Sequence, residues 1–237
     1  MNSNLYDLES NSLTSGLFVI SSTNNTINYK GNITTDTSSG NGRFIASMNA
    51  AGNTFNLNGD INVLGTGTTS RIFFQANGDC TMNYSGKITG NYASAIGRPR
   101  NGGVVNINNS YIESEVDGPD SSVFTNNTTV LGTGRLNNSY VRLTNNTNGV
   151  VDGEDNNIFI NNSNIINLGT GSTVAYNTTD NGNLQTLNST FVSSYSGATS
   201  ILYTGSTSVI ASNTTVGSDY NINDLKGNIT TLTDLTI

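Results

Sequence analysis

The stretch Asn157-Ile-Phe-Ile-Asn-Asn-Ser-Asn-Ile165 recurs in altered form along most of the chain. Each copy has an apolar residue, a short polar corner of Asn, Gly and Ser, and a second apolar residue, here named the anchor. The anchors are Ile33, Ile61, Ile88, Ile112, Val141, Ile165, Phe191 and Val216. Successive anchors lie about 24 to 29 residues apart, which is a period typical of solenoid proteins. The sequence therefore predicts a stack of similar coils.

The residues between the anchors indicate β-structure. A pair of apolar residues precedes each anchor, from Phe18-Val19 in the first copy to Ile201-Leu202 in the last. Apolar and polar residues alternate in segments such as Thr54-Phe-Asn-Leu57, and this period of two is typical of strands. The β-branched residues Thr, Val and Ile, which favour strands, are frequent in these segments. We predict an all-β chain with three short strands in each coil.

The polar corners predict a ladder of asparagine side chains. Asparagine tolerates the left-handed backbone conformation that tight corners require. Asn109, Asn138 and Asn162 occupy the same place in three consecutive copies, so they are expected about 4.8 Å apart with hydrogen bonds between their amides. We interpret this ladder as structural.

Three Gly-Thr-Gly segments are interpreted as turns. They are Leu64-Gly-Thr-Gly67, Leu131-Gly-Thr-Gly134 and Leu168-Gly-Thr-Gly171. None of them has the strand–turn–helix context of a phosphate-binding loop, so no nucleotide site is expected.

The repeat divides the chain into three parts. Residues 17–216 are predicted to form one parallel β-helix of about eight coils. Residues 1–16 precede the repeat and are expected to be an N-terminal cap or attachment segment. Residues 217–237 are predicted to form a partial coil, a C-terminal cap or an oligomerisation segment, in which Leu225-Lys-Gly-Asn-Ile229 is interpreted as a further corner. The apolar last residue, Ile237, predicts that this end pairs with another chain.

Composition excludes several classes of function. Only 34% of the 237 residues are hydrophobic, which suits the thin apolar axis of a solenoid. The formal charge of −7, with 16 acidic and 9 basic residues, disfavours a nucleic-acid partner. No apolar run is long enough to span a bilayer, and the first twenty residues contain no recognisable secretory signal. The single Cys80 allows no internal disulfide, and we expect no metal or cofactor.

Two acidic clusters are the candidates for catalysis. Glu113 and Glu115 follow one anchor, and Asp152, Glu154 and Asp155 follow an apolar pair. Glycosidases use two carboxylates about 5 to 10 Å apart, so these clusters are the weak catalytic candidates of the chain. A calcium site at Asp152-Gly-Glu-Asp155 is an alternative, although the spacing of an EF-hand loop is missing. The third interpretation, solvated surface charge, favours a protein that is not an enzyme.

Tyr111 and Tyr140 are the candidates for binding. Both precede an anchor in an Asn-Asn-Ser-Tyr motif, so strand alternation is expected to turn both rings outward on adjacent coils. Two exposed rings could contact a glycan or a neighbouring subunit. They could equally be a cross-strand pair that stiffens the sheet.

The coil length, the three strands and the Asn/Gly corners resemble the right-handed parallel β-helix, the pectate-lyase-like architecture. With its acidic, Asn/Thr/Gly-rich composition and no His or Trp, the region 17–216 resembles bacteriophage fibre, spike and capsid-decoration proteins. The resemblance implies a homotrimer on the virion surface, attached to other virion proteins and contacting a host cell-surface glycan. Two alternatives stay open: a tailspike-type polysaccharide depolymerase with paired carboxylates, and a β-helix module of a microbial cell-surface adhesin.

Overall fold

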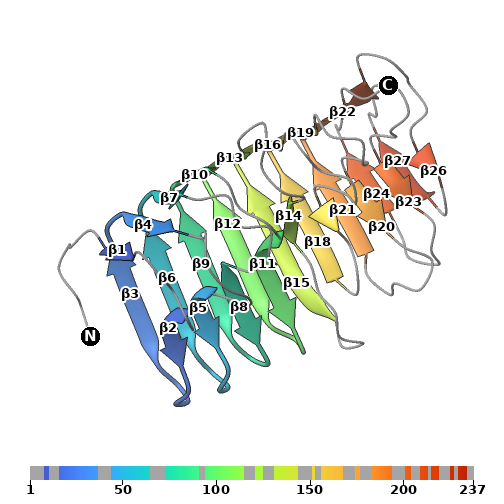
Figure 1. Cartoon of the computed structure of the whole chain (residues 1–237). Helices are drawn as coiled ribbons and strands as arrows, with labels where there is room; N and C mark the ends of the chain where they lie inside the picture. Colours follow the sequence, from blue (N-terminus) through green and yellow to red (C-terminus); the bar gives the residue numbers. More distant parts are fainter. Residues whose placement is uncertain are drawn as a thin grey trace.

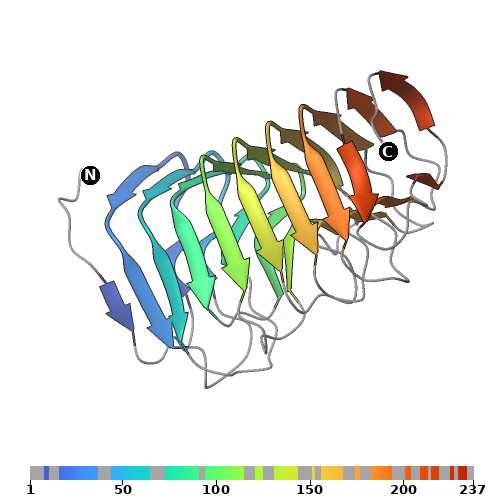
Figure 2. The same cartoon turned by 90° about the horizontal axis from the view of Figure 1, so that it is seen from above.

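The computed structural model shows an all-β parallel solenoid whose coils follow one another along a single axis (Figures 1 and 2). It describes residues 8–10, 16–36, 44–64, 73–90, 94–114, 121–124, 131–143, 151–152, 156–167, 174–176, 183–193, 201–203, 209–212, 215–218, 225–226 and 229–233. These ranges contain strands, turns and bends but no helix, and hence no helix that could cross a membrane.

The strands form three parallel sheets, and each coil contributes one strand to each sheet. Sheet I contains β2 (Gly16–Ile20), β5 (Phe44–Met48), β8 (Phe74–Asn77), β11 (Ser94–Arg100), β14 (Ser121–Phe124), β17 (Val151–Asp152), β20 (Val174–Tyr176), β23 (Ile201–Tyr203) and β26 (Leu225–Lys226). Sheet II contains β3 (Thr26–Lys30), β6 (Thr54–Asn58), β9 (Thr81–Ser85), β12 (Val104–Asn108), β15 (Gly132–Asn137), β18 (Asn156–Asn161), β21 (Asn183–Leu187), β24 (Val209–Ser212) and β27 (Ile229–Thr233). Sheet III contains β1 (Leu8–Ser10), β4 (Ile33–Asp36), β7 (Ile61–Leu64), β10 (Lys87–Gly90), β13 (Tyr111–Ser114), β16 (Tyr140–Leu143), β19 (Asn164–Asn167), β22 (Thr190–Ser193) and β25 (Thr215–Ser218).

The anchors form one continuous column in sheet III, as the repeat predicts. Each anchor is the direct register partner of the next, from Ile33 on β4 to Val216 on β25. The side chains from Ile33 to Phe191 are buried, with at most 1% of their surface exposed. Apolar anchors therefore stack on apolar anchors and form a narrow hydrophobic core, in agreement with the low content of hydrophobic residues.

The two ends of the chain add strands beyond the repeat. The segment 1–16 contributes β1, which pairs with β4, and the segment 217–237 contributes β26 and β27, which pair with β23 and β24. For this reason each sheet contains nine strands, whereas the sequence indicated about eight coils. The interpretation of Leu225-Lys-Gly-Asn-Ile229 as a copy of the anchor corner is wrong, because Leu225 belongs to sheet I and Ile229 to sheet II, whereas the anchors belong to sheet III. The capping and oligomerisation roles stay predictions.

Glycines make room for large rings in the core. Phe124 on β14 is fully buried, and a Cβ atom at Gly97 or Gly134 would lie only 3.0 Å from its ring. Neighbouring positions that alternate large and small fill a narrow interior without voids. The interpretation of Leu131-Gly-Thr-Gly134 as a turn is therefore wrong: Gly132 to Gly134 lie within strand β15, and Gly134 packs beneath an aromatic ring.

The corner between sheets II and III holds the predicted asparagine ladder. Asn109, Asn138, Asn162 and Asn188 all have left-handed φ angles of 49° to 50°. The Nδ2 group of Asn138 donates to Oδ1 of Asn109 at 3.2 Å, and Asn162 donates to Asn138 at 3.1 Å. Asn188 continues the ladder with a bond of 3.0 Å to Asn162. Both features that the sequence predicts for these residues, the backbone conformation and the stacked amides, are confirmed.

A second, buried ladder follows the asparagines. Ser110, Ser139, Ser163 and Ser189 are at most 5% exposed. The backbone N–H of Ser110 donates to Oγ of Ser139 at 3.1 Å, and the same bond joins Ser139 to Ser163 and Ser163 to Ser189. Each Ser Oγ also donates to the carbonyl oxygen two residues earlier in its own coil, as from Ser139 to Asn137 at 2.8 Å. The hydroxyls of Ser139, Ser163 and Ser189 therefore each close their own corner and accept a backbone N–H of the preceding coil.

We expect Ser139→Ala to lower the free energy of unfolding by about 1 to 3 kcal/mol, because the buried N–H of Ser110 loses its acceptor. Urea denaturation followed by circular dichroism measures the change. Ser85→Ala, at the last residue of strand β9, is the control and should have less effect, because the Ser85 side chain is only half-buried. Equal losses in the two variants would contradict the proposed role of the serine ladder.

Candidate functional site

Tyr111 and Tyr140 lie side by side on the outer face of sheet III. They are register partners on β13 and β16, and their rings stack with centroids 5.1 Å apart and planes 14° apart. Lys87 on β10 is the partner of Tyr111 on the other side, and its Nζ lies 5.3 Å from the centre of the Tyr111 ring. The predicted outward orientation on adjacent coils is confirmed. Both faces of the Tyr111 ring are thus occupied, one by Tyr140 and one by Lys87.

Glu113 lies next to the tyrosines and is fixed by two partners. The Tyr111 hydroxyl donates to Oε2 of Glu113 at 2.7 Å, and Nη1 of Arg142 donates to Oε1 at 2.8 Å. The hydrogen bond from Tyr111, followed by the contact with Arg142, holds the pKa of the Glu113 carboxyl below its usual value. In return the hydrogen bond to Glu113, with smaller contributions from burial and the carboxylate charge, raises the pKa of the Tyr111 phenol.

This geometry limits the chemistry of the cluster. A general acid in glycoside hydrolysis needs a raised carboxyl pKa, whereas that of Glu113 is lowered. Sugars stack on exposed aromatic faces, whereas Tyr111 offers only the edge of its ring. The cluster is therefore best described as a cross-strand support of sheet III.

The other catalytic candidates lie largely outside the described residues. Glu115, Glu154 and Asp155 are outside them, and for Asp152 only the backbone is described, as the last residue of strand β17. The carboxylate pair and the calcium site therefore stay predictions. Within the described ranges, no three His, Cys, Asp or Glu side chains lie close enough together to hold a metal ion.

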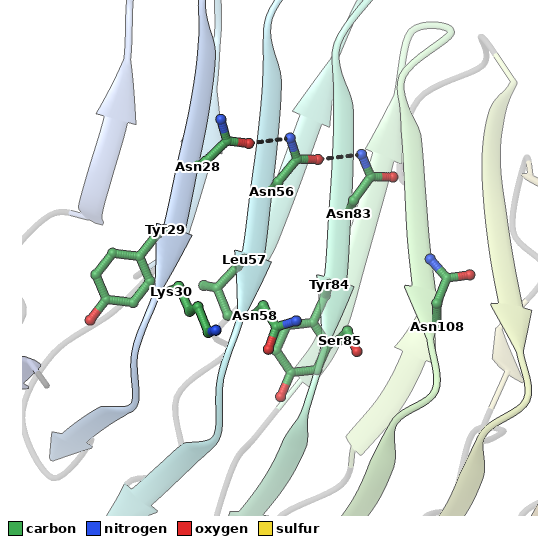
Figure 3. A pocket seen from close by; sticks show the side chains of 10 residues that line it. All are labelled: Asn28, Tyr29, Lys30, Asn56, Leu57, Asn58, Asn83, Tyr84, Ser85 and Asn108. Atoms are coloured by element: carbon green, nitrogen blue, oxygen red, sulfur yellow. Dashed lines mark hydrogen bonds between the residues drawn. The ribbon is translucent and has the colours of Figure 1, made fainter. Parts of the chain in front are cut away.

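A polar groove of about 540 Å³ lies on the outer face of sheet II, near the corner with sheet III (Figure 3). It crosses four strands, β3, β6, β9 and β12. The lining residues are Asn28, Tyr29, Lys30, Asn56, Leu57, Asn58, Asn83, Tyr84, Ser85 and Asn108. Tyr29, Leu57 and Tyr84 have buried side chains, so strand alternation places their backbone at the floor, between two rows of outward side chains.

One wall of the groove is a further asparagine ladder. Asn56 donates to Asn28 and Asn83 donates to Asn56, each at 2.7 Å (Figure 3). Asn106 continues the row with a bond of 2.7 Å to Asn83, and Nη1 of Arg135 donates to Asn106 at 3.4 Å. All four bonds point from a later coil to an earlier one, so the side-chain dipoles are aligned and reinforce one another.

The opposite wall consists of Lys30, Asn58, Ser85 and Asn108. Lys30 is the one charged residue among the residues that line the groove, although the whole chain carries a formal charge of −7. The groove thus presents amide, hydroxyl and ammonium groups and no carboxylate.

This groove was not predicted from the sequence. The available signal was an Asn immediately before the apolar residue that precedes the corner, as in Asn28-Tyr29, Asn56-Leu57, Asn83-Tyr84 and Asn106-Ile107. This Asn recurs with the same period as the anchors, but it identifies only one of the two rows of side chains that form the groove.

No family model matches the chain, and the comparisons with curated proteins and with solved structures also give no match.

We expect Tyr111 to lose its proton at a higher pH than an ordinary tyrosine, and Glu113→Gln to shift this titration to lower pH. The reason is that the neutral amide no longer opposes a negative charge on the phenolate. Absorbance at the tyrosinate band measures the titration. Subtracting the curves of Tyr111→Phe and of the Glu113→Gln, Tyr111→Phe double variant isolates Tyr111 in each background.

The free energies of unfolding of the wild type and of Glu113→Gln, measured as a function of pH, check the same prediction. The lowered pKa of Glu113 stabilises the fold above about pH 4, and this stabilisation is lost as the pH falls through the folded value. The raised pKa of Tyr111 stabilises the fold below about pH 10, and this is lost as the pH rises through the folded value. The advantage of the wild type over Glu113→Gln should therefore be largest at neutral pH. A constant difference at every pH would contradict this interpretation.

Proposed function

We propose that the chain is a non-enzymatic structural protein of a virion surface, a fibre, spike or decoration that presents a rigid binding or assembly surface. The observation that carries the proposal is that outward polar side chains bond along the axis from coil to coil. Ladders of this kind occur on the face of sheet II and at the corner between sheets II and III. A surface whose polar groups are fixed to one another resists bending and offers few mobile groups for chemistry.

The Glu113 carboxylate is held by two partners, which supports the proposal that the protein is not an enzyme. Of the predicted catalytic carboxylates, it is the one whose side chain is described, and it is engaged by Tyr111 and Arg142 with a lowered pKa. A role on a virion surface is supported by the resemblance in composition and coil pattern to bacteriophage fibre, spike and decoration proteins.

We further propose that the protein forms a homotrimer. The ends of a parallel solenoid present unpaired strand edges, which association with another chain can cover. Light scattering of the purified protein should give a mass near three times the 24.9 kDa of the chain. A mass of one chain at all concentrations would contradict the trimer.

The location on a virion surface has a direct test. Antibodies raised against the purified chain should label the surface of virus particles from the source culture in electron microscopy, and the particles should carry the protein through a density gradient. Antibodies preabsorbed with the purified chain are the control. Labelling of the microbial cell surface alone would overturn the proposal in favour of the adhesin, and absence of label from both surfaces would also overturn it.

A further inference from the structure

We propose that the groove on sheet II binds an extended, hydroxyl-rich glycan that lies along the solenoid axis. This inference deepens the proposed function, on which it rests only for the origin of the glycan at a host surface. The shape of the groove suits such a ligand. The two walls consist of side chains that are two residues apart on the same strands, such as Asn56 and Asn58. The walls therefore lie about 7 Å apart along the strand direction. The groove crosses four strands with a repeat of about 4.8 Å, which suits a linear polymer with one unit per coil.

The ladder wall can form hydrogen bonds with sugar hydroxyl groups. An amide side chain has two N–H donors and an oxygen with two lone pairs. In the ladder, Asn56 uses one donor toward Asn28 and one lone pair toward Asn83. The same holds for Asn83, which donates to Asn56 and accepts from Asn106. The ladder thus leaves Asn56 and Asn83 one N–H donor and one lone pair each, and sugar hydroxyls can use both.

The charge and the rigidity of the groove also favour a glycan. A single lysine and no carboxylate line the groove of an otherwise acidic protein, so neutral or acidic sugars meet no repulsion there. One cation is too few for a nucleic acid, whose binding depends on several neutralised phosphates. The ladder fixes Asn56 and Asn83 before any ligand arrives, which lowers the entropic cost of binding.

The groove offers no exposed aromatic face. The side chains of Tyr29 and Tyr84 are buried, and their hydroxyl groups donate to the carbonyl oxygens of Asn32 and Gly59. Binding is therefore expected to depend on hydrogen bonds, and selectivity on the pattern of hydroxyl groups along the glycan.

The test uses the full chain and an array of neutral and uronic-acid-containing oligosaccharides, from disaccharides to octasaccharides, with an array of unrelated peptides beside it. We expect binding to linear tetrasaccharides and longer chains, and weaker binding to disaccharides. Titration calorimetry with the best-bound oligosaccharide then compares variants. Lys30→Ala combined with Asn58→Ala should weaken binding about tenfold or more, which corresponds to 1.4 kcal/mol or more. Asn62→Ala, an exposed asparagine on sheet III, is the matched control and should bind like the wild type.

A second variant keeps the test decisive if the double substitution disturbs folding. Ser85→Tyr places a ring in the groove from a half-buried position and should abolish binding while the circular dichroism spectrum is unchanged. The proposal is overturned if no oligosaccharide binds, if peptides alone bind, or if both groove variants bind like the wild type. If the protein binds glycan but antibodies do not label virus particles, the virion assignment is overturned and the proposal for the groove stands. If antibodies label virus particles but no glycan binds, the proposal for the groove is overturned and the virion assignment stands.

Discussion

In-register stacking of like side chains is the constraint on which this structure depends. A parallel strand must find all its backbone partners in the coils before and after it, because no hairpin pairs it locally. The anchor column from Ile33 to Val216 shows how the register is kept: each coil presents an apolar residue at the same depth. The buried serines carry the register through the corner, where backbone N–H groups would otherwise be without acceptors.

The same constraint shapes the surface. Polar residues that face outward at equivalent positions lie one strand spacing apart, close enough for amides to bond to amides and for tyrosines to stack. Such contacts stabilise the coil stack, but they also engage groups that a reactive site would need, as the bonds of Tyr111 and Arg142 to Glu113 illustrate. The groove on sheet II is different, because its asparagine ladder faces a second row of polar side chains across the floor.

Much of this architecture could be predicted from the sequence, because a solenoid repeats its local chemistry at a fixed period. The anchors, the outward tyrosines and the asparagine ladder at the corner all follow from that period. The buried serines could not be recognised, since a Ser beside two Asn residues suggests an exposed turn until the register shows its hydroxyl beneath another backbone N–H. Gly97 and Gly134 were equally hidden, because their role depends on the Phe124 ring, which belongs to a neighbouring coil for Gly97 and to a different sheet for Gly134. The groove lies between two rows of side chains. The repeat in the sequence identifies each row separately and does not show that the two rows enclose a groove.

The most direct test of this account is native-state hydrogen exchange, measured by NMR, at the backbone amides of Ser110, Ser139 and Ser163. These N–H groups belong to polar corners, where exchange is commonly fast. If these N–H groups donate to the serine hydroxyls of the next coil, they should exchange as slowly as the backbone amides of the sheet II strands that precede the corners. Exchange at the rate of exposed turns would contradict the stacked corner, and with it the register of the whole solenoid.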